Sequence, residues 1–187
     1  MPSNTPFGFT PSRHLTGGVI RANEYRIASA YGTSIFKGDP VKLINDGTIQ
    51  LAAAGDRILG IFQGVQWVAT DGSVQFNERW IASTTLQTGS VARAMVVDDP
   101  NVLFEVQSGG TPALTNVGNL ADHVAGTGST VTGMSGAYLD STMGTGAAGF
   151  RIRSIVDKPG NSGIYSLLEV QIFEHEFAEH SQATPGV

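Results

Sequence analysis

The feature that most constrains this chain is its division into short apolar runs, each ended within a few residues by a turn sequence. The clearest example is DPVKLI-NDG-TIQLA, residues 39–52, in which apolar side chains alternate on both sides of the Asp46-Gly47 pair. The alternating residues are Val41, Leu43, Ile49 and Leu51. A period of two is typical of strands, and Asp-Gly favours a tight turn between antiparallel strands. The stretch therefore predicts a β-hairpin.

Further turn sequences follow at Asp71-Gly72 and at Asp99-Pro100-Asn101, again between apolar runs. No stretch has the periodicity of a long amphipathic helix. We therefore expect an all-β fold, a barrel or sandwich of about nine or ten short strands. We place these strands in a single β domain over residues 19–177, with a Gly/Thr-rich insertion at residues 108–149. A flexible tail is expected at residues 178–187.

Residues 1–18 are expected to form an extended N-terminal arm that is mobile in solution and becomes ordered on a partner. Three prolines fix φ and disfavour a helix there: Pro2, Pro6 and Pro11. Phe7 and Phe9 are the expected apolar anchors of an interface, and Arg13 and His14 its polar contacts. The other interpretation of this segment is a disordered terminus.

The charge distribution excludes several classes of protein. Charged residues make up 14% of the chain, against roughly 25% in ordinary soluble domains, so the surface relies on neutral polar groups. The net charge is −5 and the 11 basic residues form no cluster, so we expect no direct nucleic-acid partner. The chain lacks cysteine. It has no secretory signal pattern and no apolar run of about 20 residues, so we expect no membrane partner.

The stretch FEHEFAEH, residues 173–180, comes close to a zinc-protease signature. That signature requires two histidines four residues apart on one face of a helix. His175 and His180 are five residues apart, a spacing that separates them on a helix and places them on opposite faces of a strand. The preceding LLEVQI is a strand pattern, so we predict no metal site here.

Two other motifs also fail on context. Gly144-Thr-Gly-Ala-Ala-Gly149 matches a dinucleotide fingerprint, but it precedes a strand, whereas the fingerprint must follow one and open a helix. GMSGA, residues 133–137, falls one residue short of a serine-nucleophile elbow. We therefore assign no catalytic, cofactor-binding or metal-binding residues and expect no enzyme.

The segment GDPVKLINDGTIQLAAAGDRILGIFQGV, residues 38–65, resembles the capsid decoration (cement) proteins of tailed bacteriophages. The shared plan is a GD-x-V-x-L hairpin followed by a second GD turn that leads into the next strand. The flanking segments beginning PSRHLTGG and VVDDPNVLFEVQ are similar to those of small structural proteins of tailed phages.

The resemblance implies a β-tulip or related β-barrel and a homotrimer seated at the local three-fold axes of an icosahedral shell. It implies the major capsid protein as partner, and localisation in the virion on the outer surface of the capsid. In such proteins an N-terminal arm often lies on the shell, a role that residues 1–18 suit.

Two alternatives remain open. A phage tail-tube or head–tail connector subunit is also a β-rich chain of this size, and a tube subunit would form hexameric rings. From another class of protein, a carbohydrate-binding β-sandwich would present aromatic side chains on one face. The chain has only two Trp and four Tyr for that purpose.

Overall fold

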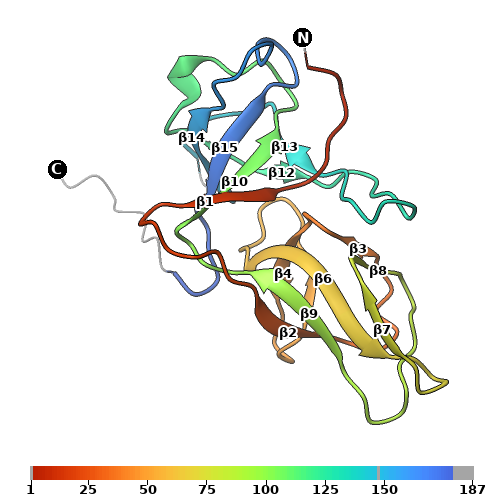
Figure 1. The fold of residues 1–187 in the computed structure, drawn as a ribbon. Coiled ribbons are helices and arrows are strands. Elements are labelled where there is room, and N and C mark those ends of the chain that lie inside the picture. Colours follow the sequence, from red (N-terminus) through yellow and green to blue (C-terminus); the bar gives the residue numbers. More distant parts are fainter. Residues whose placement is uncertain (1, 147, 179–187) are drawn as a thin grey trace.

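The computed structural model describes residues 2–146 and 148–178 of the 187-residue chain, and these residues form an all-β protein. Two antiparallel sheets lie one above the other in Figure 1, each with loops and short strands around it. Within the described residues no barrel closes, and the arrangement is sandwich-like. The all-β prediction is confirmed. The expected tail at residues 178–187 lies, beyond Ala178, outside the described residues.

The first sheet has five strands in the order β1-β10-β15-β14-β11. Their bounds are β1 Thr10–His14, β10 Val102–Gln107, β11 Leu120–Ala121, β14 Phe150–Ile155 and β15 Leu167–Ile172. Neighbouring strands are antiparallel throughout. β1 is an edge strand of this sheet, since among the described residues it pairs only with β10.

The second sheet has six strands, with β2-β9-β6-β4-β5 in a row and β7 also paired with β6. Their bounds are β2 Asn23–Ile27, β4 Pro40–Leu43, β5 Ile49–Leu51, β6 Gly60–Val68, β7 Val74–Asn77 and β9 Ala92–Val97. The central strand β6 pairs with β4 through Gly60 and Ile61 and with β7 through residues 65–68, while β9 pairs with residues 61–66.

Two small sheets complete the fold, β3 (Ile35–Phe36) with β8 (Arg79–Trp80) and β12 (His123–Val124) with β13 (Tyr138–Leu139). A 3-10 turn spans Leu114–Asn116. The described residues form fifteen strands, more than the nine or ten expected, and nine of them have four or more residues. Of the remaining six, β5 is the second strand of the predicted hairpin, and the other five have two residues each, too few to produce a period in the sequence. Three of these five lie in the segment 108–149.

Each sheet has its own hydrophobic core. The first core contains Phe9, Phe104, Phe150 and other buried apolar residues of β10, β14 and β15. The second core is built around Phe62 and Trp80, with buried apolar residues of β2, β3, β4, β5, β6 and β9. Ile61 of β6 and Val97 of β9 belong to the first core although their strands lie in the second sheet. The two sheets are therefore joined by shared apolar packing.

The predicted hairpin is confirmed. β4 pairs with β5 in the register Val41 with Leu51 and Leu43 with Ile49. Gly47 has a φ of +79°, a left-handed conformation that glycine adopts without steric cost. The Asp46 carboxylate accepts the backbone N–H of Thr48 at 2.8 Å, which is the local bond expected of a turn aspartate.

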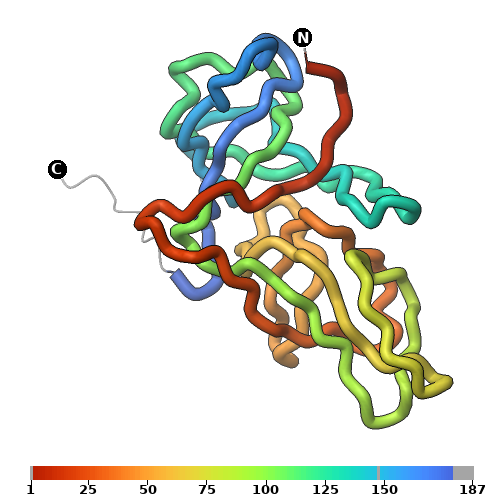
Figure 2. Tube along the Cα trace, viewed as in Figure 1, coloured from red at the N-terminus to blue at the C-terminus, as the bar shows by residue number. Residues whose placement is uncertain are grey.

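The N-terminal segment differs from the expected mobile arm. It runs past the first sheet, crosses the molecule between the two sheets as β1 and continues into β2 of the second sheet (Figure 2). β1 is hydrogen-bonded to β10, with Thr10 opposite Glu105 and His14 opposite Val102. Residues 10–14 are therefore an integral strand, because the edge of β10 supplies backbone partners that a local reading of the sequence cannot show.

Candidate functional site

Phe9 is a core residue of its own chain rather than an anchor for a partner. Its side chain is fully buried and stacks on the ring of Phe150, with centroids 4.2 Å apart. The imidazole of His123 meets the Phe9 ring edge-on at 6.5 Å. The expectation that Phe9 binds a partner is therefore wrong, since no surface of this side chain is left for one.

The chain enters the core at Gly8, where it passes between two other segments. The Gly8 N–H donates to the carbonyl of Ala137, and the Phe9 N–H donates to the carbonyl of Gly38. Gly8 has a φ of +79°, and a Cβ there would lie 2.7 Å from the Cβ of Ser135. Only glycine suits this position, so the N-terminal segment is held between the loops that contain Gly38 and Ser135.

Both aspartates of the GD motifs have structural partners. Asp39 is buried, and its carboxylate accepts the Phe36 N–H at 2.7 Å and the Ser135 hydroxyl at 2.5 Å. Burial raises the pKa of Asp39 to about 6, although these hydrogen bonds oppose the shift. Asp56 accepts the Ala53 N–H and the ammonium of Lys42, both at 2.8 Å. The motif therefore fixes the turns before β4 and β6.

Arg13 is bound to Glu169 of β15. Its guanidinium donates two hydrogen bonds of 2.8 Å, one to each oxygen of the carboxylate. The hydroxyls of Ser12 and Ser154 donate to the same carboxylate. The hydrogen bond from Arg13 is the largest influence that lowers the pKa of Glu169, while burial opposes it. Sequence reasoning missed Glu169 because it occupies an ordinary alternating position in LLEVQI.

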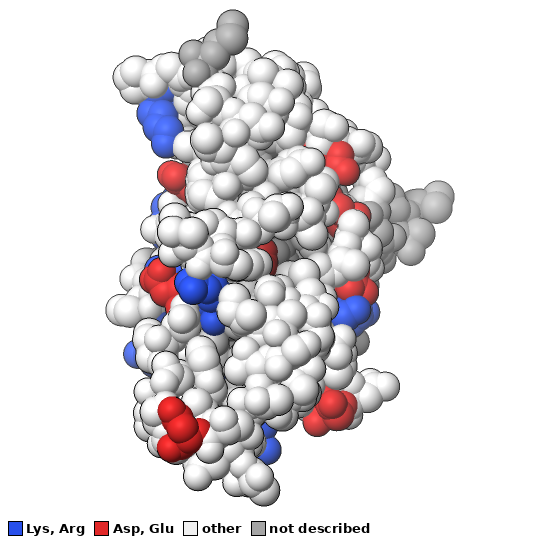
Figure 3. Space-filling view, turned by 90° about the vertical axis from the view of Figure 1, so that its right-hand side faces the viewer, with Lys and Arg blue, Asp and Glu red and all other residues white. Residues whose placement is uncertain are grey.

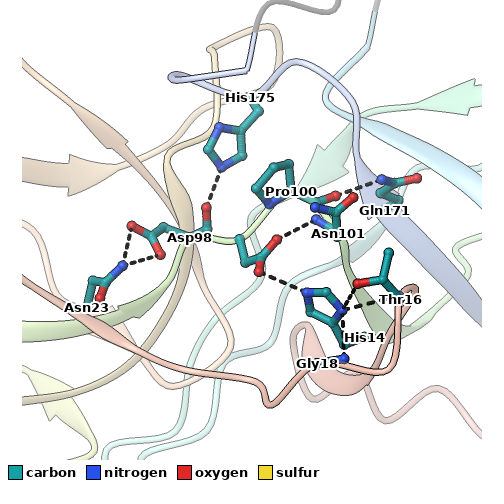
Figure 4. Close-up of polar contacts among 10 residues, drawn as sticks. His14, Thr16, Gly18, Asn23, Asp98, Pro100, Asn101, Gln171 and His175 are labelled. Atoms are coloured by element: carbon teal, nitrogen blue, oxygen red, sulfur yellow. Dashed lines mark hydrogen bonds and ion pairs between the residues drawn. The ribbon is translucent and has the colours of Figure 1, made fainter.

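His14 fastens the end of β1 to the turn between β9 and β10 (Figure 4). Its Nδ1 accepts the backbone N–H groups of Thr16 and Gly18, each at 3.2 Å. A nitrogen that accepts these bonds carries no proton, so we assign the proton to Nε2. Nε2 then donates to the Asp99 carboxylate at 2.9 Å. Asp99 was expected only to form the turn, and its bond to His14 depends on tertiary structure.

His175 of the FEHEFAEH stretch reaches the same turn from the other side, as Figure 4 shows. It is buried, and its Nε2 donates to the carbonyl of Asp98 at 2.7 Å while Nδ1 accepts the Phe177 N–H. The side chain of Asn23 binds the Asp98 carboxylate, and Gln171 binds the carbonyl of Pro100. His180 lies outside the described residues. Residues 2–146 and 148–178 contain no group of three or more potential metal ligands.

Phe7 is half-buried and lines a cleft of about 390 Å³ beside the N-terminal segment. Pro2, Ser3 and Thr5 form one wall, the loop Lys158–Asn161 forms the other, and Gln107 and Leu167 complete the lining. Of the four residues assigned to an interface, Phe9, Arg13 and His14 thus contact their own chain, and Phe7 faces a cleft. The guanidinium side chain of Arg13 is still 60% exposed.

The exposed surface offers few charges and some apolar side chains. The face in Figure 3 is mostly neutral, with scattered acidic and basic groups. On β7, Val74 and Phe76 are 64% and 63% exposed. Their spacing of two residues in SVQFN is the spacing that places side chains on one face of a strand.

Searches with this chain found no matching family model, no matching curated protein and no matching solved structure. Within the described residues there is no helix of the length and apolar character needed to cross a membrane.

Proposed function

We propose that this protein is a structural virion protein that decorates and stabilises the capsid of a tailed phage by binding the outer surface of the major capsid protein shell. The observation that carries the proposal is the segment 38–65, which resembles decoration proteins. Its hairpin and its two GD turns form the continuous unit β4–β5–β6. A segment that resembles a family in sequence and also forms that family's expected hairpin supports the proposal more strongly than the motif alone.

The neutral surface suits such a role. Burying few charges on binding avoids large desolvation costs, and a protein that binds only the assembled shell stabilises it by mass action. Many identical contacts on a symmetric shell reinforce one another when the subunits are linked.

The contact with the shell is assigned to the open edge of β1. Thr10, Ser12 and Arg13 are exposed along this edge strand, which can accept a strand of a capsid subunit by β-augmentation. A strand edge that is already ordered loses less conformational entropy on binding than a mobile arm would.

Cosedimentation with empty shells assembled from the major capsid protein tests the proposal. The wild-type protein should saturate a fixed set of sites per shell. Thr10→Lys, which places a charge on the edge of β1, should reduce occupancy roughly tenfold. Val131→Lys, at a residue that is 90% exposed in the insertion, is the matched control and should bind as the wild type does. Absence of the protein from saturated shells contradicts the proposal.

The assembly state is part of the same proposal. Light scattering of the purified protein should give the mass of a homotrimer. A stable hexameric ring would favour the tail-tube function instead.

A further inference from the structure

A small hollow of about 150 Å³ lies at the end of the first sheet, between the N-terminal segment, β13 and the loop before β15. It is lined by Asn4, Gln107, Ser108, Gly109, Tyr138 and Tyr165. The lining contains amides, hydroxyls and aromatic rings and no charged group. A pocket of this composition suits a neutral ligand that has both polar groups and an apolar face.

Several polar groups around the hollow are free to bind a ligand. Among the described residues, nothing hydrogen-bonds to the hydroxyl of Tyr138, the hydroxyl of Tyr165 or the side-chain amide of Asn4. A phenol can both donate and accept, and an amide offers two donors and an acceptor. The hollow thus presents a mixed set of donors and acceptors, as a ligand with several hydroxyl groups requires.

The two tyrosines are held in position by their backbone surroundings. A Cβ at Gly109 would lie 2.9 Å from Cε2 of Tyr138, so the absence of a side chain there lets the ring lie close to the backbone. Tyr165 has a φ of +66°, which is unusual for a bulky residue and costly unless the surroundings impose it. The next residue, Ser166, is fixed by the Ser108 N–H, which donates to its carbonyl at 2.9 Å.

Gln107 separates the hollow from the larger cleft and lines both. It is 4% exposed, and its Nε2 donates to the carbonyl of Ser3 at 2.8 Å. Its Oε1 is buried with no hydrogen-bond partner in the described chain, a state that costs free energy. That bond to Ser3 is the sole hydrogen bond described between residues 2–6 and the rest of the fold, and Oε1 is an unpaired acceptor on a residue that lines both pockets.

We propose that the hollow binds one ring of a neutral oligosaccharide and that the adjoining cleft holds the next sugar. A sugar ring has an apolar face that packs on an aromatic ring and a rim of hydroxyls that match the free tyrosine, asparagine and glutamine groups. The cleft continues with Phe7 and Pro159 as apolar walls. This site is separate from the open edge of β1 and adds glycan recognition to the proposed capsid function.

Titration of the full chain with maltotriose, cellotriose and chitotriose, after a screen on an array of neutral and charged glycans, tests the site. One class of neutral oligosaccharide should bind. Tyr165→Ala and Asn4→Leu should each weaken its Kd about tenfold, and Tyr138→Phe should weaken it less because the ring remains. Phe76→Ala, which removes an exposed aromatic ring on β7, is the matched control and should leave the Kd unchanged.

Asn4 is exposed, so the Asn4→Leu variant reports on binding even if a tyrosine variant fails to fold. The proposal is overturned if no neutral glycan binds, if only charged glycans or peptides bind, or if Asn4→Leu binds as the wild type does. Occupancy of capsid shells by Asn4→Leu should equal that of the wild type, which separates this site from the capsid contact.

Discussion

Two buried carboxylates, Asp39 and Glu169, respond to pH in opposite directions because their surroundings differ. The described hydrogen-bond partners of Asp39 are neutral, and burial raises its pKa. Glu169 accepts two hydrogen bonds from Arg13, and this contact lowers its pKa. Each carboxylate therefore makes the stability of the fold depend on pH over a different range.

Asp39 should make the protein less stable as the pH rises. The pKa of Asp39 is about 6 in the folded protein, against an ordinary value of 3.8. The stabilisation from protonated Asp39 is therefore fully present below pH 3.8 and is lost as the pH rises through about 6. A difference of about two units corresponds to about 3 kcal/mol. Asp39→Asn, whose amide can donate to the Ser135 hydroxyl, should therefore gain stability relative to the wild type between about pH 4 and 7. Chemical denaturation across this range checks the difference, and a constant difference would contradict it.

Glu169 should show the reverse dependence. Because its pKa is lowered in the folded protein, ionised Glu169 stabilises the fold at a pH above its ordinary pKa of 4.5. This stabilisation is lost as the pH falls through the lowered pKa. Glu169→Gln should cost about 1–3 kcal/mol at neutral pH and less in acid. Glu24→Gln is the control, because the Glu24–Arg93 pair is exposed on both sides and should contribute less than about 1 kcal/mol. Equal losses in the two variants at neutral pH would refute this account of Glu169.

At the scale of the element, the hairpin of β4 and β5 could be predicted from the sequence, whereas the strand β1 could not. The hairpin depends on the turn around Gly47 and on a local alternation, and both are visible within residues 41–51. β1 pairs Thr10 with Glu105, and the Arg13–Glu169 pair joins residues 156 positions apart. Pairs so far apart in the sequence form only in the folded protein. Residues 1–18 therefore looked like a free arm when the sequence was considered locally. The site in the hollow was out of reach for the same reason, since Asn4, Tyr138 and Tyr165 meet only in the tertiary structure.

The N-terminal segment should contribute strongly to stability from residue 7 onward and little before it. Phe9→Ala removes a fully buried ring and should cost about 3–5 kcal/mol. Deletion of residues 2–6 removes a segment whose sole described hydrogen bond to the rest of the fold is through Ser3, and the midpoint of denaturation should change little. Deletion of residues 2–14 should leave the protein unfolded or strongly destabilised, because it also removes β1. An unchanged midpoint after the longer deletion would show that β1 is dispensable.

At the scale of the whole molecule, two cores are coupled through strands that contribute to both. Ile61 and Val97 belong to the first core while their neighbours Phe62 and Val96 belong to the second. The segment just before β6 also pairs with the residues that follow β15, since the Ile58 N–H donates to the carbonyl of Glu174 and the Glu176 N–H to the carbonyl of Ile58. Unfolding either sheet alone would expose apolar surface of the other.

We therefore expect the protein to unfold in one cooperative transition, as a single β domain would, despite its two cores. Calorimetry should give a calorimetric enthalpy equal to the van't Hoff enthalpy. Ile61→Ala, at the boundary between the cores, should lower the stability of the whole protein by about 2–5 kcal/mol, and Val131→Ala, at an exposed position, should lower it by less than about 0.5 kcal/mol. Two separate transitions in the wild type would show that each sheet folds on its own. Splitting of the transition only in Ile61→Ala would identify this residue as the link between them.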